Sequence, residues 1–563
     1  MHRLVASFLL LLSLVSGLLA QAPPMEPSSV SAAPWEFIGP TNIGGRVLSV
    51  AINPNNPGTI WAGTAGNGLW RSRSYGKNGA WQRISLGLPV IAVSAIAISP
   101  ADSNTVYVGT GESYGYQAAI TPNIDRYTQG SNGYGILKTT NGGASWTQVL
   151  AWQPSQRRTV KALRMNPQNP ASIFACTSEG IYQTMNAGAT WNLILPQILA
   201  QDVVFNKDDT TLVMASVGMG RSPGIGTYLS LDGGAEWFQM ETFPVFNSRA
   251  RLEPSAVDGN VVYAAVTTDT VFSTAIWRTT DFGGTWDTVR RVRPSFGNFQ
   301  QQDAFNPWYS LFIAVNPQNA STFFVGGADG RFTTDGGATL ITANGAGTSF
   351  LDYAHDPTNP DRLYVVTEGG LFVTDDFGFN FESLNQGLVT AQIQTGFSNS
   401  KTDPNFAIGQ VPGNPGGLLP GGAGVIYHGT TTWELDEGDE AGWTAISPVN
   451  DSIIYRAWRY AINVTRSNNR GGSYTLGSLL NGGGGVFIFE PGAWNAPMIM
   501  APSNPSVLFL ARQKILKSAD GSDSWSTISG VLDNNYATAM AMSWNGIDTL
   551  YVGTAPMATS AHI

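Results

Sequence analysis

Carboxylates recur at a fixed place in this sequence, shortly after short apolar stretches that contain an aromatic residue. Three follow that aromatic residue by five positions and a fourth lies one position out of register: Glu112, Glu179, Asp329 and Glu368. A partial ring of carboxylates on one face of a repeat protein could bind a cation or the hydroxyls of a sugar. The competing interpretation, which we weigh more heavily, is a solvated turn, because Glu179 and Asp329 each precede a glycine. The four are nevertheless candidate ligand-binding residues.

The densest acidic cluster follows a loop rich in proline and glycine, at residues 412–424. It contains four carboxylates in five residues: Asp436, Glu437, Asp439 and Glu440. Together with backbone carbonyls they could hold Ca²⁺, although their spacing differs from that of an EF-hand loop. A solvated loop is the competing interpretation. We predict these four as weak metal-ligand candidates, with Asp436 and Asp439 also as ligand-binding candidates, and we predict no other cofactor.

Other side chains suggest little catalytic chemistry. Trp308 is not used by the repeat described below and could stack on a sugar ring, although ordinary packing is the competing interpretation. The few histidines show no zinc-ligand spacing, and no Gly-x-Ser-x-Gly segment indicates a serine nucleophile. Cys176, the single cysteine, lies in an apolar stretch and is predicted to be buried and inert. We therefore nominate no catalytic residue.

A repeat of about 45 residues must position these candidates. Its signature is a recurrent turn, Ser/Thr-x-Asp/Asn-x-Gly-x-x-aromatic, in which the acid or amide accepts backbone N–H groups and glycine allows positive φ. The eight clear copies span Thr139–Trp146, Thr184–Trp191, Ser230–Trp237, Thr279–Trp286, Thr333–Leu340, Thr374–Phe381, Ser467–Tyr474 and Ser518–Trp525. We interpret the aspartates of these turns as structural.

Each period holds four short strands, which is the content of a propeller blade. Two decayed copies, one near Ser72 and one between Phe381 and Ser467, raise the number of blades to about ten. The sequence therefore predicts an all-β fold, a β-propeller of about ten four-stranded blades, forming a single large ring or two smaller propellers in tandem. Residues 34–563 form this propeller, and Ala537–Thr554 begins an eleventh blade that is incomplete at the C-terminal end. We expect Trp35–Pro40 to supply the outermost strand of the last blade.

The first twenty residues indicate the compartment. His2 and Arg3 precede an apolar run that ends at Ala20, which is typical of a secretory signal peptide. We predict a flexible linker at residues 21–33. We expect a secreted or periplasmic protein without membrane insertion. A formal net charge of −9 argues against binding nucleic acid.

The recurrent turn resembles the Asp-box, or BNR repeat, of sialidases, sortilin-type propellers and xyloglucan-cleaving hydrolases. Trp35–Pro40, followed by Gly44-Gly45-Arg46, resembles the start of secreted bacterial sortilin-like repeat proteins. This resemblance implies a binding or scaffold module for extracellular protein, peptide or glycan, and it leaves the oligomeric state open.

The same resemblance offers an enzyme alternative, a glycoside hydrolase of the xyloglucanase type. Such an enzyme uses two carboxylates, and the family carries one of them in a Thr-Asp-x-Gly-Gly segment after the second strand of the first blade. Here that segment corresponds to Thr64–Gly68, and Ala65 stands where the carboxylate is expected. We therefore rank binding or scaffolding first and polysaccharide hydrolysis second.

Overall fold

The computed structural model describes most of the chain after residue 35. The described ranges are 36–89, 92–117, 126–219, 222–246, 249–267, 274–292, 310–327, 329–347, 349–393, 396–411, 423–436, 442–458, 463–477, 492–493, 495–543 and 549–555. All the sheets belong to one compact unit, Gly39–Ile563. Within the described ranges, no helix has the length and apolar character needed to cross a bilayer.

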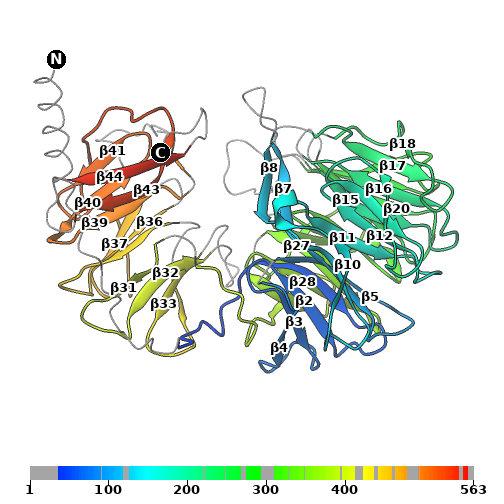
Figure 1. The fold of residues 1–563 in the computed structure, drawn as a ribbon, viewed down its shortest axis with the longest axis horizontal. Helices are drawn as coiled ribbons and strands as arrows, with labels where there is room; N and C mark the ends of the chain where they lie inside the picture. Colours follow the sequence, from blue (N-terminus) through cyan, green and yellow to red (C-terminus); the bar gives the residue numbers. More distant parts are fainter. Residues whose placement is uncertain are drawn as a thin grey trace, which may run out of the picture. The chain divides into compact units, whose positions relative to one another are not determined.

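Seven four-stranded antiparallel sheets come first (Figure 1). The first three comprise β1 (Val47–Ile52), β2 (Ile60–Thr64), β3 (Leu69–Ser72) and β4 (Trp81–Ile84); β5 (Val93–Ile98), β6 (Val106–Thr110), β9 (Gly135–Thr139) and β10 (Thr147–Ala151); and β11 (Val160–Met165), β12 (Ile173–Thr177), β13 (Gly180–Thr184) and β14 (Asn192–Leu195). A separate hairpin of β7 (Glu112–Gln117) and β8 (Arg126–Ser131) is inserted between β6 and β9, and a short 3₁₀ turn, Pro154–Gln156, follows β10.

The next four sheets repeat this order. They comprise β15 (Ala200–Phe205), β16 (Val213–Val217), β17 (Gly226–Ser230) and β18 (Phe238–Gln239); β19 (Ala250–Pro254), β20 (Val262–Thr267), β21 (Thr274–Thr279) and β22 (Asp287–Val292); β23 (Phe312–Asn316), β24 (Asn319–Gly326), β25 (Gly330–Thr333) and β26 (Ile341–Thr342); and β27 (Phe350–Asp356), β28 (Asn359–Thr367), β29 (Gly370–Thr374) and β30 (Glu382–Ser383).

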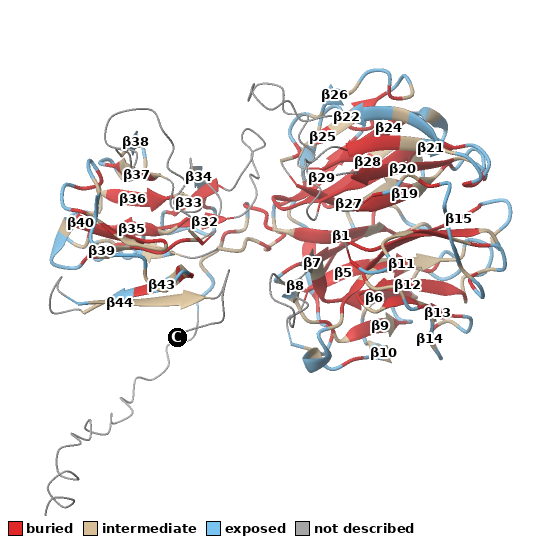
Figure 2. Ribbon diagram, turned by 90° about the horizontal axis from the view of Figure 1, so that it is seen from above, coloured by how far each residue is buried: buried red, intermediate tan, exposed pale blue. Residues whose placement is uncertain are grey.

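The seven sheets close into a propeller, here called the ring. Their innermost strands pack in sequence from β1 through β5, β11, β15, β19 and β23 to β27, and β27 packs back on β1. One apolar cluster fills each junction between neighbouring sheets, including the junction of the seventh sheet with the first. Figure 2 shows that buried residues fill the inner strands of the ring and exposed residues lie mainly in its outer loops. Because the second strand of a sheet is covered on both faces, β2, β6, β12 and β16 are apolar without alternation and fully buried.

A second group of sheets follows the ring. It comprises β31 (Ser398–Asn399), β32 (Ala407–Val411), β33 (Ala423–Tyr427) and β34 (Glu434–Asp436); β35 (Thr444–Ile446), β36 (Ile454–Ala457), β37 (Val464–Ser467) and β38 (Thr475–Leu476); β39 (Met498–Ala501), β40 (Asn504–Ala511), β41 (Ile515–Ser518) and β42 (Ser526–Thr527); and the two-stranded pair β43 (Tyr536–Met542) and β44 (Leu550–Ala555). The inner strands β31, β35, β39 and β43 pack one after another.

The sheets agree with the predicted repeat. Ten four-stranded sheets and the beginning of an eleventh are present, and the decayed copy between Phe381 and Ser467 falls in the eighth sheet. Because the first seven sheets close on themselves, a single ring of ten blades is excluded, and the arrangement follows the tandem alternative.

The recurrent turn has the predicted hydrogen bonds. In the sixth sheet the Thr333 hydroxyl donates to Asp335 (2.7 Å) and accepts the N–H of Gly337 (3.1 Å), while Asp335 accepts the N–H of Thr339 (2.9 Å). The corresponding bond from hydroxyl to acid or amide measures 2.6–2.9 Å in all eight copies. The backbone N–H of Thr339, with the Thr339 and Thr333 hydroxyls, lowers the pKa of Asp335 to about 2. These aspartates therefore satisfy their own turns, as the sequence predicted.

The segment before β1 contacts a different sheet from the one predicted. Trp35 lies outside the described residues, but Thr41 donates its N–H to the carbonyl of Thr431 (2.8 Å), and Asn42 exchanges two hydrogen bonds with the backbone of Trp433. These bonds place residues 41–42 beside the eighth sheet, and residues 36–40 do not form the predicted strand. Each sheet of the ring is built from consecutive parts of the chain. The ring closes by packing of side chains between the first and the seventh sheet, so it needs no added strand.

Candidate functional site

Two of the predicted ligand carboxylates form ion pairs with arginines that lie just before an innermost strand. Glu112 lies 2.9 Å from the guanidinium of Arg46, which precedes β1, and both side chains are largely buried. Glu179 lies 3.4 Å from the guanidinium of Arg158, which precedes β11. Each pair therefore ties the end of a second strand to the beginning of an inner strand.

The other two predicted carboxylates lie in the sixth and seventh sheets. Asp329 is 3.6 Å from Arg331 of β25, and Glu368, in the turn between β28 and β29, is buried. Across the part of the chain that the structure describes, no three His, Cys, Asp or Glu side chains come close enough to share a metal ion. The predicted role of these carboxylates in ligand binding stays a prediction.

Asp436 belongs to a buried polar cluster of the second group. Its Oδ2 accepts hydrogen bonds from Arg456 (2.7 Å) and from the Tyr474 hydroxyl (2.8 Å), and the Arg456 guanidinium also lies 4.6 Å from the centre of the Tyr474 ring. Arg456 is only 1% exposed. The cluster joins β34, β36 and the recurrent turn after β37, so its geometry is that of a structural ion pair.

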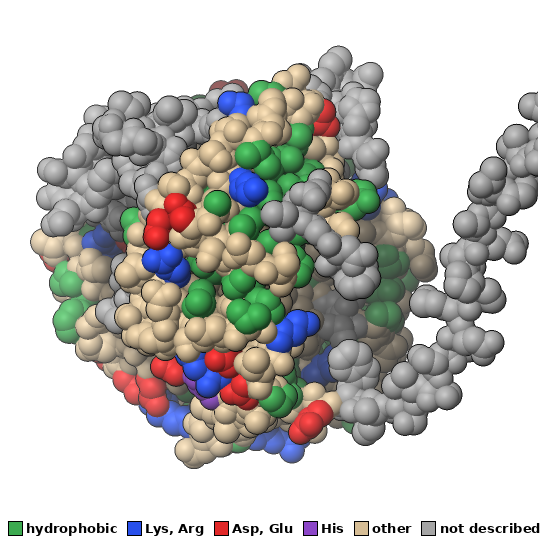
Figure 3. Space-filling view, turned by 90° about the vertical axis from the view of Figure 1, so that its left-hand side faces the viewer, with side chains coloured by type: hydrophobic (Ala, Val, Ile, Leu, Met, Phe, Trp, Pro, Cys, Tyr) green, Lys and Arg blue, Asp and Glu red, His purple; other side chains and the backbone are tan. Residues whose placement is uncertain are grey.

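Several other predictions fall outside the described residues. They concern Trp308, Glu437, Asp439 and Glu440. The predicted calcium site and the predicted sugar-stacking tryptophan therefore stay predictions. On the face of the second group shown in Figure 3, acidic and basic side chains lie interspersed among apolar and neutral polar ones.

Charged residues that the sequence analysis did not single out meet inside the ring. Asp202 on β15 accepts bonds from Arg164 on β11, with Nε 2.9 Å from Oδ1, and lies 3.3 Å from Arg251 on β19. Asp202 and Arg251 are almost completely buried. A carboxylate shared by two guanidiniums on neighbouring inner strands links three sheets of the ring.

A second set of polar contacts joins β19 to β27. The Tyr353 hydroxyl donates to Glu253, and His355 Nε2 lies 3.4 Å from the other oxygen of Glu253. Burial first, and then the charge of Glu253, raises the pKa of Tyr353, which keeps this phenol protonated as a donor. We refer to the two sets together as the axial cluster.

Two groups that interact electrostatically with arginines of the axial cluster have shifted pKa values. Burial first, and then the positive charges of Arg249 and Arg251, lower the pKa of Lys161 to about 7. Burial raises the pKa of Asp352. Such shifts are common at functional sites but also occur in structural ion-pair networks.

A hollow of about 20 Å³ is lined by Glu112, Ser94, Ser113 and Lys161 together with the apolar side chains of Leu48, Val160 and Leu351. This volume is about that of one water molecule. The contacts of the axial cluster link sheets of the ring to one another.

The sequence did contain a signal for the axial cluster. Propeller inner strands are expected to be apolar, yet β11, β15, β19 and β27 each carry charged residues in otherwise apolar stretches. Nothing in the sequence indicates which of these strands are neighbours, so the charges could not be paired before the ring was known.

The segment in which the family resemblance expects a carboxylate forms a closed turn after β2. Ala65 is buried and donates its N–H to the carbonyl of Arg46 (3.1 Å), and the Asn67 amide donates to the carbonyl of Val389 (2.7 Å). Arg46 in turn holds Glu112. The turn thus has alanine where the carboxylate is expected. Arg46 connects this turn to a nearby carboxylate, because its carbonyl accepts the Ala65 N–H and its guanidinium pairs with Glu112.

Two curated proteins that are similar to part of the sequence are xyloglucanases. No family model matches the chain. A xyloglucanase of Hypocrea jecorina is 22% identical over 308 residues, covering 47% of this chain and 35% of that enzyme. A xyloglucanase of Paenibacillus sp is 26% identical over 324 residues, covering 50% of this chain and 29% of that enzyme. The aligned part thus spans about a third of the length of these curated relatives.

Several solved structures are similar over larger parts of the chain. The GH74 xyloglucanase from Xanthomonas campestris has a TM-score of 0.49 at 15% identity, and the GH74 enzyme of Niastella koreensis has 0.48 at 17%. Both comparisons cover 92% of this chain and 84% of the other. YCF48 from Cyanidioschyzon merolae has a TM-score of 0.39 at 13% identity, covering 60% of this chain and 97% of that protein.

Proposed function

We propose that this chain is a secreted glycoside hydrolase of the xyloglucanase type that acts on a β-glucan polysaccharide. The observation that carries the proposal is the similarity of about half the chain to two xyloglucanases. That similarity favours the hydrolase alternative over the binding or scaffold module that the sequence analysis ranked first. Secretion is supported by the apolar run that ends at Ala20.

The chemistry requires two carboxylates on opposite sides of the scissile bond, roughly 6.5–9.5 Å apart in an inverting enzyme and about 5–5.5 Å apart in a retaining one. Ala65 has no carboxylate and therefore cannot be either of these two residues. Glu112 is the carboxylate linked to the Ala65 turn, through the 2.9 Å ion pair with Arg46 and the bond from the Ala65 N–H to the Arg46 carbonyl. We therefore assign Glu112 as the first carboxylate to test.

The experiment measures reducing ends released from a panel of β-glucans that includes xyloglucan. We expect release from xyloglucan by the full chain, and a loss of about 100-fold or more in Glu112→Gln if the carboxylate takes part in proton transfer. The matched control is Glu434→Gln, which alters an exposed carboxylate paired with His428. Absence of release by folded protein from every glucan would contradict hydrolysis, and equal activity of the two variants would remove Glu112 from the mechanism.

Ala65 favours a second candidate, binding of the same polysaccharide without cleavage. A propeller that keeps the fold but lacks one reacting carboxylate would retain the ligand and lose the chemistry. Retention of the folded chain in a xyloglucan-containing gel, with no reducing ends released, would support this candidate over hydrolysis.

A further inference from the structure

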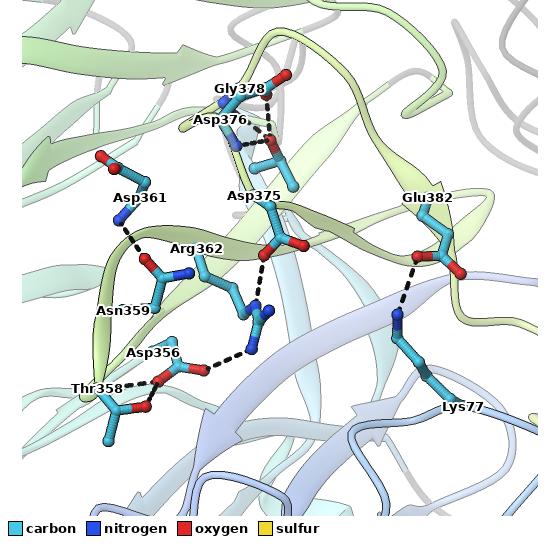
Figure 4. A network of polar contacts seen from close by, with 11 residues as sticks. Lys77, Asp356, Thr358, Asn359, Asp361, Arg362, Asp375, Asp376, Gly378 and Glu382 are labelled. Atoms are coloured by element: carbon cyan, nitrogen blue, oxygen red, sulfur yellow. Dashed lines mark hydrogen bonds and ion pairs between the residues drawn. The ribbon is translucent and has the colours of Figure 1, made fainter.

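A hollow of about 280 Å³ lies at the seam where the first sheet meets the seventh. The connection between β3 and β4 contributes Tyr75 and Lys77, and the seventh sheet contributes Arg362, Tyr364, Val373 and Asp375. Figure 4 shows Lys77 and Arg362 on the two sides of this seam, each with an acidic partner. The volume is near the lower end of the range for small-ligand sites, roughly 300–1,000 Å³.

Tyr75 is exposed at a turn position where other aromatic residues are buried. It is the fourth residue of the decayed recurrent turn in the first sheet and has a φ of 60°. Phe282 and Phe377 occupy the same position in their turns with φ values of 51° and 55°, and they are 4% and 2% exposed. Tyr75 is 42% exposed. A large side chain kept in the left-handed region without burial leaves an aromatic face open to the hollow.

The polar groups around Tyr75 are held in fixed positions. Arg362 donates from Nε to Asp375 at 2.5 Å, lies 3.5 Å from Asp356, and places its guanidinium carbon 5.9 Å from the centre of the Tyr75 ring. Lys77 lies 3.2 Å from Glu382. One guanidinium with two carboxylate partners thus lies beside the Tyr75 ring, and Asp375 is itself 61% exposed and open to a ligand.

The charges at this seam favour a neutral ligand. Two cations, Lys77 and Arg362, face three carboxylates, Asp356, Asp375 and Glu382, so the group carries no cationic excess that would attract an anion. The floor is rigid, because Tyr364 is 1% and Val373 6% exposed. Burial raises the pKa of Tyr364, so its hydroxyl stays neutral.

We propose that this seam hollow is a binding subsite for one sugar unit of a neutral glycan, with the sugar ring stacked on Tyr75 and its hydroxyls bonded to Arg362, Asp375 and Lys77. A pyranose matches this combination because its C–H face is apolar and its rim consists of hydroxyl donors and acceptors. The site lies at the seam, needs no cleavage, and depends on the proposed function only for the choice of xyloglucan as the first glycan to test.

The test is native affinity electrophoresis of the full chain in gels with and without xyloglucan. We expect Tyr75→Ala to weaken retention about three- to tenfold, as loss of an aromatic contact predicts, and Tyr75→Phe to retain most of it. The matched control is Tyr551→Ala, which removes a 64% exposed tyrosine on β44. Unchanged melting temperatures show that the variants fold.

Each outcome separates this site from the hydrolase proposal. Wild-type retention by Tyr75→Ala, or an equal loss in Tyr551→Ala, would overturn the seam site, as would a wild-type chain that no neutral glycan retains. Reducing-end release is measured on the same samples. A chain that shows Tyr75-dependent retention but releases no reducing ends would support the seam site and contradict the hydrolase proposal.

Discussion

The ring and the second group contain nearly the same strand in two different environments. Ile60-Trp61-Ala62-Gly63-Thr64 forms β2 of the ring and is fully buried. Leu550-Tyr551-Val552-Gly553-Thr554 in β44 has the same pattern, but every residue of it is partly or largely exposed. In the ring, apolar side chains of the first, second and seventh sheets cover β2 on both faces. The pattern of this strand alone therefore does not set its burial, which in β2 comes from side chains of the adjoining sheets.

The two regions also use buried charge differently. In the ring, Asp202 is shared by Arg164 and Arg251 from two other sheets. In the second group, Asp436 pairs with Arg456 and Tyr474 of the adjacent sheet. The buried carboxylate of the ring therefore links three sheets, whereas Asp436 of the second group links two neighbouring sheets.

The largest effect is expected from breaking the ionic link of the ring. Asp202→Asn leaves two guanidiniums without their shared carboxylate, and breaking a buried pair costs roughly 3–5 kcal/mol. Denaturant unfolding of the full chain, followed by tryptophan fluorescence, should show this loss in the transition of the ring. Asp436→Asn is the control and should affect the transition of the second group. A wild-type midpoint in Asp202→Asn would refute a stabilising role for the axial cluster.

A smaller effect is expected at the seam of the ring. The indole of Trp81 in the first sheet donates to the carbonyl of Leu384 after the seventh sheet (2.9 Å, both buried). Trp81→Phe removes this bond and should lower the free energy of unfolding by about 1–3 kcal/mol, since the carbonyl loses its donor. Trp525→Phe makes the same atomic change in the recurrent turn of the tenth sheet. Equal losses in the two variants would mean that the Trp81 bond contributes nothing specific to closure.

The smallest effect concerns pH. The pKa of Asp335 is about 2, below its ordinary value of 3.8, so its stabilising contribution is complete above about pH 4 and is lost as the pH falls toward 2. Asp335→Asn should therefore reduce the drop in melting temperature of the ring between pH 6 and pH 2.5. The second group offers a natural reference, because Asn469 makes the corresponding bonds without ionising. An identical pH dependence in wild type and variant would contradict the assignment.

Much of the fold could be predicted from the sequence because its signals are local. The strands, the turns and the count of ten sheets follow from apolar stretches and from hydroxyl, acid and glycine residues a few positions apart, such as Thr333, Asp335 and Gly337. For the candidate site, Glu112 and Glu179 were identified as carboxylates after second strands, but their partners were not. Arg46 lies 66 residues before Glu112, and no local pattern relates them.

The contacts between distant residues were decided by closure of the ring. Whether seven or ten sheets complete a ring depends on how neighbouring sheets twist and pack, which is a property of the assembled sheets. The axial cluster and the seam hollow exist because β27 returns to β1 and brings Arg362 beside Tyr75. The sequence by itself determined the repeated unit, since its hydrogen bonds and apolar strands are local. The tertiary structure alone decided which distant charges meet, because electrostatic and packing energies depend on distance in space and not on separation along the chain.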